Sequence, residues 1–273
     1  MDVMKLLLKE KPAPRSLLAA GRHQFFSTSR ITERLDLQYG EKERLKLDIY
    51  EPERLTEETE TIIFVHGGGW ESGDKNIHRF LGRAWARRNY VVAIPNYRLV
   101  SDASYPAQME DLTLALDWLN RNYEKFPDKF FLAGHSAGAH LASLLGFSRK
   151  WLPESGIRLA RIAGFILLSG VYVFYPFSRA DKRVQKFVGK KRYWEEAQPI
   201  NHLRDTLPPV FITHGLVDEE VYPEQSVNLG DKLTEYNIRN ELLLREDLDH
   251  IELLLDTAIS RSEFWSAVND FFF

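Results

Sequence analysis

The pentapeptide Gly134–Gly138, GHSAG, constrains the fold of this chain more than any other feature. It follows the apolar run Phe130–Ala133 and precedes the alanine- and leucine-rich stretch Ala139–Leu145. This pattern predicts a buried strand, a sharp turn and a helix. The glycines make the turn sterically possible, and the turn would hold the hydroxyl of Ser136 clear of the backbone at the start of the helix. A GxSxG pattern also occurs by chance, so the rest of the chain must support this interpretation.

A second glycine motif lies upstream, where the apolar run Thr61–Val65 leads into His66-Gly67-Gly68-Gly69-Trp70. Glycines without side chains let a substrate carbonyl approach backbone N–H groups. A flexible turn is the alternative interpretation.

Apolar runs and helical periodicity alternate along the rest of the chain. Strands are expected at residues 45–50 (half-exposed), 62–65, 90–95, 130–133, 162–168, 210–213 and 242–244, and helices at 78–88, between 106 and 126, and at 251–273. Strands alternating with helices predict an α/β fold with a doubly wound, mainly parallel sheet. Residues 33–273 are expected to form one domain, with residues 172–203 inserted as a small cap or lid.

Two polar residues follow the late strands, where the reactive groups of open parallel sheets gather. Asp218 comes shortly after the strand that ends at Thr213, and His250 lies between the last strand and the closing helix. A serine nucleophile needs a base and an acid that orients the base, and the order Ser136, Asp218, His250 is that of an α/β-hydrolase triad. Glu219 and Glu220 are alternative acids.

These motifs together resemble the α/β-hydrolase fold family, and within it the carboxylesterase and kynurenine formamidase-like group marked by HGGxW. The resemblance covers residues 33–273 and rests on His66–Trp70, Asn96–Leu99, Tyr105–Ala107, the serine elbow, His214–Val221 and His250. It favours Asp218 as the acid. It implies an oxyanion hole formed by the backbone N–H groups of Gly68, Gly69 and Ala137, with His66 organising the glycine loop.

The resemblance implies hydrolysis of carboxylic esters through an acyl-enzyme on Ser136, with no metal or organic cofactor required. An arylformamidase acting on N-formylkynurenine is the first alternative, since one oxyanion hole serves esters and formamides alike. A non-catalytic, ligand-binding protein of the same fold is the second. The expected partner is a small-molecule ester or formamide, and the sequence leaves the oligomeric state open.

Composition excludes several other classes. The net charge of −3 with interspersed signs gives no footprint for nucleic acid. The absence of cysteine excludes disulfides, thiolate zinc sites and a cysteine nucleophile. The longest uncharged stretch, Ile162–Ser178, contains glycine, serine and proline and is too short for a membrane span.

Residues 1–32 are set apart as an N-terminal segment. No acid occurs from Lys11 to Thr32, where three arginines accompany several serines. This composition is typical of a mitochondrial transit peptide, although an amphipathic helix capping the domain is the alternative. The expected location is therefore cytoplasmic, or the mitochondrial matrix if the segment directs import.

The remaining polar and aromatic side chains receive structural interpretations. His135 and His140 are expected to be buried and hydrogen-bonded, His78 and His202 to lie on the surface or the lid, and Asp247 and Asp249 to be solvated loop charges. Trp70 either lines the acyl pocket or packs beneath the glycine loop. The basic run in the insertion is expected to be a solvated face; if it faces the site, it favours a carboxylate-bearing substrate. Its members are Lys182, Arg183, Lys186, Lys190, Lys191 and Arg192.

Overall fold

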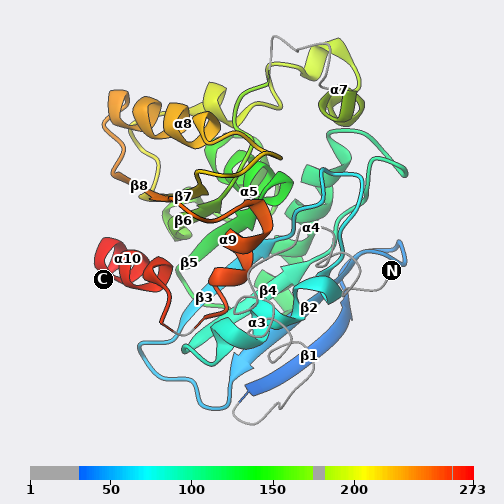
Figure 1. Cartoon of the computed structure of the whole chain (residues 1–273). Coiled ribbons are helices and arrows are strands. Elements are labelled where there is room, and N and C mark those ends of the chain that lie inside the picture. Colours follow the sequence, from blue (N-terminus) through cyan, green and yellow to red (C-terminus); the bar gives the residue numbers. More distant parts are fainter. Residues whose placement is uncertain (1–30, 175–181, 260) are drawn as a thin grey trace.

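An eight-stranded sheet organises the chain in a computed structural model that describes residues 31–174, 182–259 and 261–273 (Figure 1). The strands are β1 (Ile31–Gln38), β2 (Lys46–Pro52), β3 (Glu60–Val65), β4 (Tyr90–Pro95), β5 (Phe130–His135), β6 (Ile162–Leu168), β7 (Val210–Gly215) and β8 (Asn240–Arg245). Their order across the sheet is β1-β2-β4-β3-β5-β6-β7-β8. β2 runs antiparallel to both β1 and β4, and the other neighbours are parallel.

Helices cover both faces of this sheet. The helices are α3 (Arg79–Ala86), α4 (Ala107–Asn122), α5 (Ala137–Phe147), α6 (Trp151–Glu154), α7 (Lys182–Val188), α8 (Glu224–Glu235), α9 (His250–Asp256) and α10 (Glu263–Phe272), with 3-10 turns η1 (Lys75–His78), η2 (Leu159–Arg161), η3 (Lys191–Tyr193) and η4 (Pro199–His202). One core cluster joins the sheet to α4, α5, α6 and α8, and the other joins it to α3, α9 and α10. The predicted doubly wound α/β fold is therefore confirmed.

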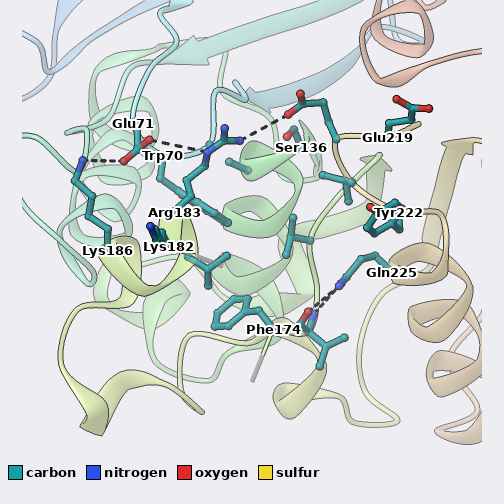
Figure 2. A pocket seen from close by; sticks show the side chains of 17 residues that line it. Trp70, Glu71, Ser136, Phe174, Lys182, Arg183, Lys186, Glu219, Tyr222 and Gln225 are labelled. Atoms are coloured by element: carbon teal, nitrogen blue, oxygen red, sulfur yellow. Dashed lines mark hydrogen bonds and ion pairs between the residues drawn. The ribbon is translucent and has the colours of Figure 1, made fainter. Parts of the chain in front are cut away.

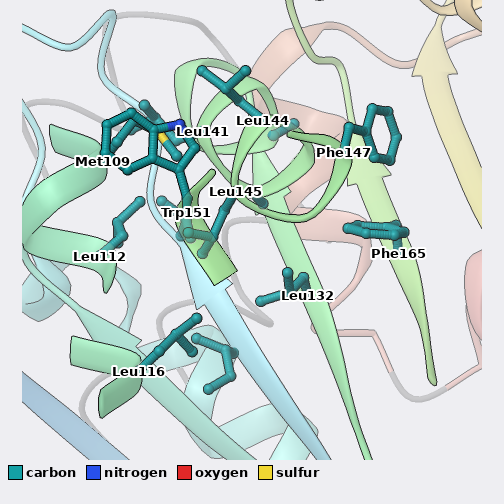
Figure 3. Close-up of a cluster of buried hydrophobic side chains, with 14 of the residues drawn as sticks. Met109, Leu112, Leu116, Leu132, Leu141, Leu144, Leu145, Phe147, Trp151 and Phe165 are labelled. Atoms are coloured by element: carbon teal, nitrogen blue, oxygen red, sulfur yellow. The ribbon is translucent and has the colours of Figure 1, made fainter. Parts of the chain in front are cut away.

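Strand β5 shows how the sheet is buried on both sides. Phe130 and Leu132 belong to the first cluster, whereas Phe131 and Ala133 belong to the second. Figure 3 shows Leu132 facing the helices α4, α5 and α6. Fully burying one such large apolar side chain contributes roughly 1.5–3 kcal/mol, so a continuous apolar strand is needed here. The strand thereby fixes the position of the serine that follows it.

The predicted half-exposed strand 45–50 is wrong in its exposure. β2 is buried along nearly its whole length because both of its faces are covered, with Leu47 and Ile49 in the first core cluster and Tyr50 in the second. Its polar residue Asp48 is fully buried and lies 2.8 Å from the ammonium of Lys75. β1 itself begins at Ile31 and so includes the last two residues of the predicted N-terminal segment.

The single closing helix predicted at 251–273 is also wrong, because the chain breaks into α9 and α10. The carbonyl of Thr257 accepts hydrogen bonds from the indoles of Trp85 and Trp265, at 3.2 and 2.8 Å. Helix α9 ends at Asp256, the chain turns at Thr257 and Ala258, and α10 begins at Glu263.

Two predictions fall wholly or partly outside the described residues. Residues 1–30 of the proposed transit peptide or capping helix lie outside them, as do residues 175–181 of the predicted insertion. The described part of the insertion contains α7, η3 and η4. No helix within the described ranges is long and apolar enough to cross a bilayer.

Candidate active site

Ser136 occupies a strained turn between β5 and α5. Its backbone has φ 56° and ψ −125°, which a residue with a side chain rarely adopts. The flanking glycines permit this turn, since a Cβ on Gly138 would lie 2.0 Å from the carbonyl oxygen of Val65 and one on Gly134 would lie 2.4 Å from Gly138. The strand and the helix therefore pack closely enough to present the serine at the end of the sheet.

The glycine loop lies against this turn. A Cβ on Gly67 would be 3.1 Å from the Cβ of Ser136, and Gly68 and Gly69 have φ values of +120° and +57°. The carbonyl of Gly68 accepts hydrogen bonds from the backbone N–H groups of Glu71 and Ser72, which hold the loop in shape. The loop that the sequence singles out is thus adjacent to the serine.

His66 anchors the start of the loop. Its fully buried ring stacks on Tyr97 with a centroid distance of 4.3 Å, and the Tyr97 hydroxyl donates to the His66 carbonyl at 2.9 Å. Burial lowers the pKa of His66 to about 3, so the ring is neutral at pH 7. This placement fits the predicted role of His66 in organising the loop.

Asp218 and His250 meet across the site. Oδ2 of Asp218, in the loop after β7, lies 2.6 Å from Nδ1 of His250, the first residue of α9. Oδ1 accepts the backbone N–H groups of Glu220 and Val221, each at 2.9 Å. A carboxylate next to Nδ1 requires the proton on that nitrogen, which leaves the lone pair of His250 on Nε2.

His214 is a second partner of Asp218 that sequence reasoning did not assign. Its Nε2 lies 3.2 Å from Oδ2 and 2.8 Å from the Val221 carbonyl, so Nε2 carries a proton; Nδ1 then accepts the hydroxyl of Ser226 at 2.6 Å. Burial of Asp218 opposes its ionisation, but hydrogen bonds from His214 and His250 outweigh burial and lower the pKa of Asp218. The carboxylate therefore stays charged near neutral pH.

Two cavities meet at Ser136. The larger, about 660 Å³, contains Ala137 and apolar residues of the chain after β6. The smaller, about 340 Å³, contains His250 together with Gly67 and Gly68. Ser136 and Gly69 line both cavities, so the two cavities adjoin at the predicted nucleophile, and His250 lines the smaller one.

The insertion forms one wall of the larger cavity. Figure 2 shows Lys182, Arg183 and Lys186 of α7 on the side nearest Trp70, and Glu219 and Tyr222 across from them. The three side chains are exposed, as predicted for a solvated face, and they also line the larger cavity. Lys190, Lys191 and Arg192 are exposed and line neither cavity.

Trp70 joins the glycine loop to the insertion. It is buried, stacks on Phe187 of the insertion at 4.5 Å, and also lines the larger cavity. Its indole donates to Nδ1 of His140 at 3.3 Å, and Nε2 of His140 lies 2.7 Å from the Ala197 carbonyl. The tryptophan and the histidine therefore attach the insertion to the base of the site.

Of the other histidine and aspartate predictions, some are confirmed and others are wrong. His135 and His140 are buried and hydrogen-bonded, as predicted. His78 is only 5% exposed and packs against Phe64, so its predicted surface position is wrong. Asp249 is not a free loop charge, because its carboxylate caps α9 by accepting two backbone N–H groups.

No cluster of three or more His, Asp or Glu side chains within residues 31–174, 182–259 and 261–273 is arranged to hold a metal ion.

Comparisons with known proteins bear on the fold and the family. The model of the BD-FAE family matches residues 47–233. An isoprenylcysteine α-carbonyl methylesterase of Arabidopsis thaliana is 27% identical over 257 residues, covering 85% of this chain and 59% of that protein. A kynurenine formamidase of Drosophila melanogaster is 26% identical over 235 residues, covering 83% of this chain and 77% of that protein. The chain thus spans less than two thirds of the length of the plant relative.

Solved structures share the fold. A truncated carbohydrate esterase from gut microbiota superposes with a TM-score of 0.78 at 20% identity, covering 90% of this chain and 97% of that one. An inhibited esterase B from Lactobacillus rhamnosis gives 0.77 at 21% identity, covering 98% and 95%. The sheet order and these likenesses identify the α/β-hydrolase fold.

Proposed function

This chain belongs to the BD-FAE family, and from that premise we propose that it is a serine hydrolase that cleaves carboxylic esters. The observation that carries the proposal is the 2.6 Å contact between Asp218 and His250, whose imidazole lines a cavity that Ser136 also lines. A strained serine, an imidazole with its free lone pair on Nε2 and an ionised orienting acid are the groups that acyl transfer requires.

In the proposed mechanism, Nε2 of His250 takes the proton of the Ser136 hydroxyl as its oxygen attacks the ester carbonyl. The backbone N–H groups of Gly68, Gly69 and Ala137 donate to the oxyanion. Collapse of the tetrahedral intermediate breaks the bond to the alcohol oxygen, which receives the proton from His250 and leaves an acyl-enzyme. Water, deprotonated by His250, then releases the acid and regenerates the serine.

The names of the relatives and neighbours support an ester substrate. The A. thaliana relative is a methylesterase, and the two solved structures are esterases. These names describe those proteins, and for this chain they support testing carboxylic esters first.

Hydrolysis of a formamide such as N-formylkynurenine is the second candidate, and the D. melanogaster relative favours it. A formyl group would occupy very little of a cavity of about 660 Å³, which favours a larger acyl group and hence the ester. The 2.6 Å contact between His250 and Asp218, and the cavity that Ser136 and His250 both line, support a catalytic role over a non-catalytic one.

The test is a side-by-side assay of p-nitrophenyl acetate, p-nitrophenyl octanoate and N-formylkynurenine, with Ser136→Ala as the control. We expect an ester to be the better substrate, and Ser136→Ala to lower kcat by ~10⁴-fold or more while circular dichroism stays unchanged. Catalytic efficiency about tenfold greater on the formamide would replace the ester with the second candidate. A folded wild type that neither turns over a substrate nor reacts with a fluorophosphonate would support the non-catalytic role.

A further inference from the structure

The two cavities at Ser136 are assigned to opposite halves of a substrate by the position of His250. This step rests on the proposed function. The imidazole that receives the serine proton must hand it to the leaving alcohol, so the alcohol has to lie beside His250. His250 lines the smaller cavity and not the larger one. The smaller cavity therefore takes the alcohol, and the larger takes the acyl group.

The linings of the two cavities differ in chemistry. The smaller contains the apolar side chains Ile77, Phe80, Ile251 and Leu254. The larger contains Lys182 and Lys186, which line it alone, and Arg183, which lies where the two cavities meet. Lys182 and Lys186 thus lie on the acyl side together with Glu219, whereas Arg183, Glu71 and Glu220 border both cavities.

Arg183 reaches furthest toward the reacting centre. A Cβ on Gly69 would lie 2.6 Å from Cδ of Arg183 and 3.2 Å from its Nε and Nη1, so the side chain rests on the glycine loop. Figure 2 shows its guanidinium between Glu71 on one side and the neighbourhood of Ser136 on the other. A charge held there can contact a group attached to the acyl chain.

The carboxylates that accompany Arg183 hold it loosely. Glu71 and Glu220 lie 3.9 and 3.7 Å from its nitrogens, beyond hydrogen-bond distance, and the Arg183 side chain is 58% exposed. Glu71 also has a closer cation, since Lys186 lies 2.8 Å away. Exposed ion pairs of this kind contribute little, so a substrate carboxylate can displace them and form two parallel hydrogen bonds with the guanidinium.

We propose that Arg183 forms a binding subsite for a carboxylate carried by the acyl half of the substrate, so that the preferred esters are monoesters of dicarboxylic acids. The apolar cavity beside His250 accepts an uncharged alcohol. An ester whose negative charge lies on the alcohol half gains less, because Arg183 only borders that cavity, whose other side chains include the apolar Ile77, Phe80, Ile251 and Leu254.

The test compares esters that differ only in a terminal charge. The acyl series is monoethyl glutarate, adipate and suberate against ethyl pentanoate, hexanoate and octanoate, followed by ethanol release. The alcohol pair is 5-acetoxypentanoate against pentyl acetate, followed by acetate release. We expect kcat/KM to favour the charged ester in at least one acyl pair, and the neutral ester in the alcohol pair.

Four variants assign the preference to Arg183. Arg183→Met should lower the charged-to-neutral ratio of kcat/KM about tenfold or more, the loss expected for a charge-assisted hydrogen bond, and Arg183→Lys should retain part of it. Glu220→Gln should raise the ratio, because it removes a competing carboxylate. Lys191→Met, an exposed lid cation outside both cavities, is the matched control and should leave the ratio unchanged.

A ratio that Arg183→Met leaves unchanged would overturn the subsite, as would a wild-type preference for charge on the alcohol half or for the neutral ester in every acyl pair. In these cases hydrolysis of ethyl hexanoate, abolished in Ser136→Ala, would leave the proposed function standing. If the wild type hydrolyses no ester, the proposed function itself fails and the subsite falls with it.

Discussion

The ring of His135 lies 4.5 Å from the ring of His250, and its Nε2 is 2.8 Å from the His250 carbonyl oxygen. His135 is the last residue of β5 and immediately precedes Ser136, whereas His250 begins α9. One side chain therefore ties the backbone of the proposed base to the strand that carries the proposed nucleophile.

Replacing His135 should disturb catalysis through the position of His250. We expect His135→Phe to lower kcat about 10- to 100-fold with a smaller change in KM, because the donor to the His250 carbonyl is lost and the imidazole shifts. His135→Gln, which can still donate, should retain more activity. Steady-state kinetics of the two variants check this, and equal losses in both would show that volume rather than the hydrogen bond matters.

Buried histidines should make the protein sensitive to mild acid. Burial lowers the pKa of His66 to about 3, lowers those of His78 and His140 to about 4, and lowers that of His135 well below its usual value. Each pKa is depressed by folding, so its contribution to stability is present above the unfolded value of about 6.5 and is lost as the pH falls toward the folded value. Each histidine then removes about 1.4 kcal/mol per pH unit from the free energy of unfolding.

Denaturant unfolding at several pH values between about 6.5 and about 4.5 measures this slope. His140→Gln should reduce the slope by about one proton. Identical slopes for the wild type and His140→Gln would mean that His140 does not take up a proton on unfolding.

Asp218→Asn should lower kcat far more than the substitution of a neighbouring acid in the same loop. An amide in place of the carboxylate no longer fixes the proton on Nδ1 of His250, and the corresponding change in a serine protease lowers kcat ~10⁴-fold. Glu219→Gln, an exposed acid in the same loop, should keep near-wild-type kcat. If Glu219→Gln were the more damaging variant, the orienting acid would have been assigned to the wrong residue.

The Asp218 carboxylate should also stabilise the fold. Its pKa is lowered in the folded state, so the stabilisation is present above the unfolded pKa of about 3.9 and disappears as the pH falls toward the lower folded value. Wild type and Asp218→Asn should therefore differ more in unfolding free energy at neutral pH than at about pH 3. A difference independent of pH would contradict the depressed pKa.

The glycine loop can be tested with a control that separates strain from collision. Gly68→Ala places a methyl group 2.4 Å from the Ser72 carbonyl oxygen at φ +120°, whereas Gly156→Ala meets nothing within 4 Å at φ +71°. Gly156→Ala should lose about 1–2 kcal/mol of stability, the cost of a left-handed alanine, and Gly68→Ala should lose more, because its methyl group also collides with the Ser72 backbone. Only Gly68→Ala should also lose ~10²–10³-fold in kcat, as displaced oxyanion donors would. Equal kcat in the two variants would remove Gly68 from the oxyanion hole.

The sequence predicts the proposed nucleophile and its partners because the signals are local. The serine turn lies within one pentapeptide, and Asp218 and His250 each follow a strand whose end the sheet topology brings to the same edge. Missed elements depend on contacts between distant segments. β1 is obscured because Glu33 interrupts its apolar side, and only the structure shows that Arg83 of α3 neutralises it at 2.8 Å.

The sequence also does not show which charged residues of the insertion face the site. Arg183 enters the site because α7 packs Phe187 onto Trp70, and nothing in the basic run itself distinguishes its first half from its second. The sequence offers a signal for His214, which lies near the end of β7 and precedes Asp218 by four residues. Its partner Ser226, however, comes from α8.

Asp249 should support both the helix and the histidine that begins it. Its Oδ1 accepts the backbone N–H groups of Ile251 and Glu252 at 2.9 and 2.7 Å, and Glu252 returns a bond to the Asp249 N–H. Because His250 is the first residue of α9, fraying of this helix would displace the proposed base.

We expect Asp249→Ala to lower the free energy of unfolding by about 1 kcal/mol and to lower kcat with it, whereas Asp249→Ser should recover most of both. Asp247→Ala, an exposed acid in the same loop, should change stability by less than about 0.5 kcal/mol. Denaturant melts and steady-state rates of the three variants decide the matter: if Asp249→Ala behaves like Asp247→Ala in both, the cap holds neither the helix nor the imidazole in place.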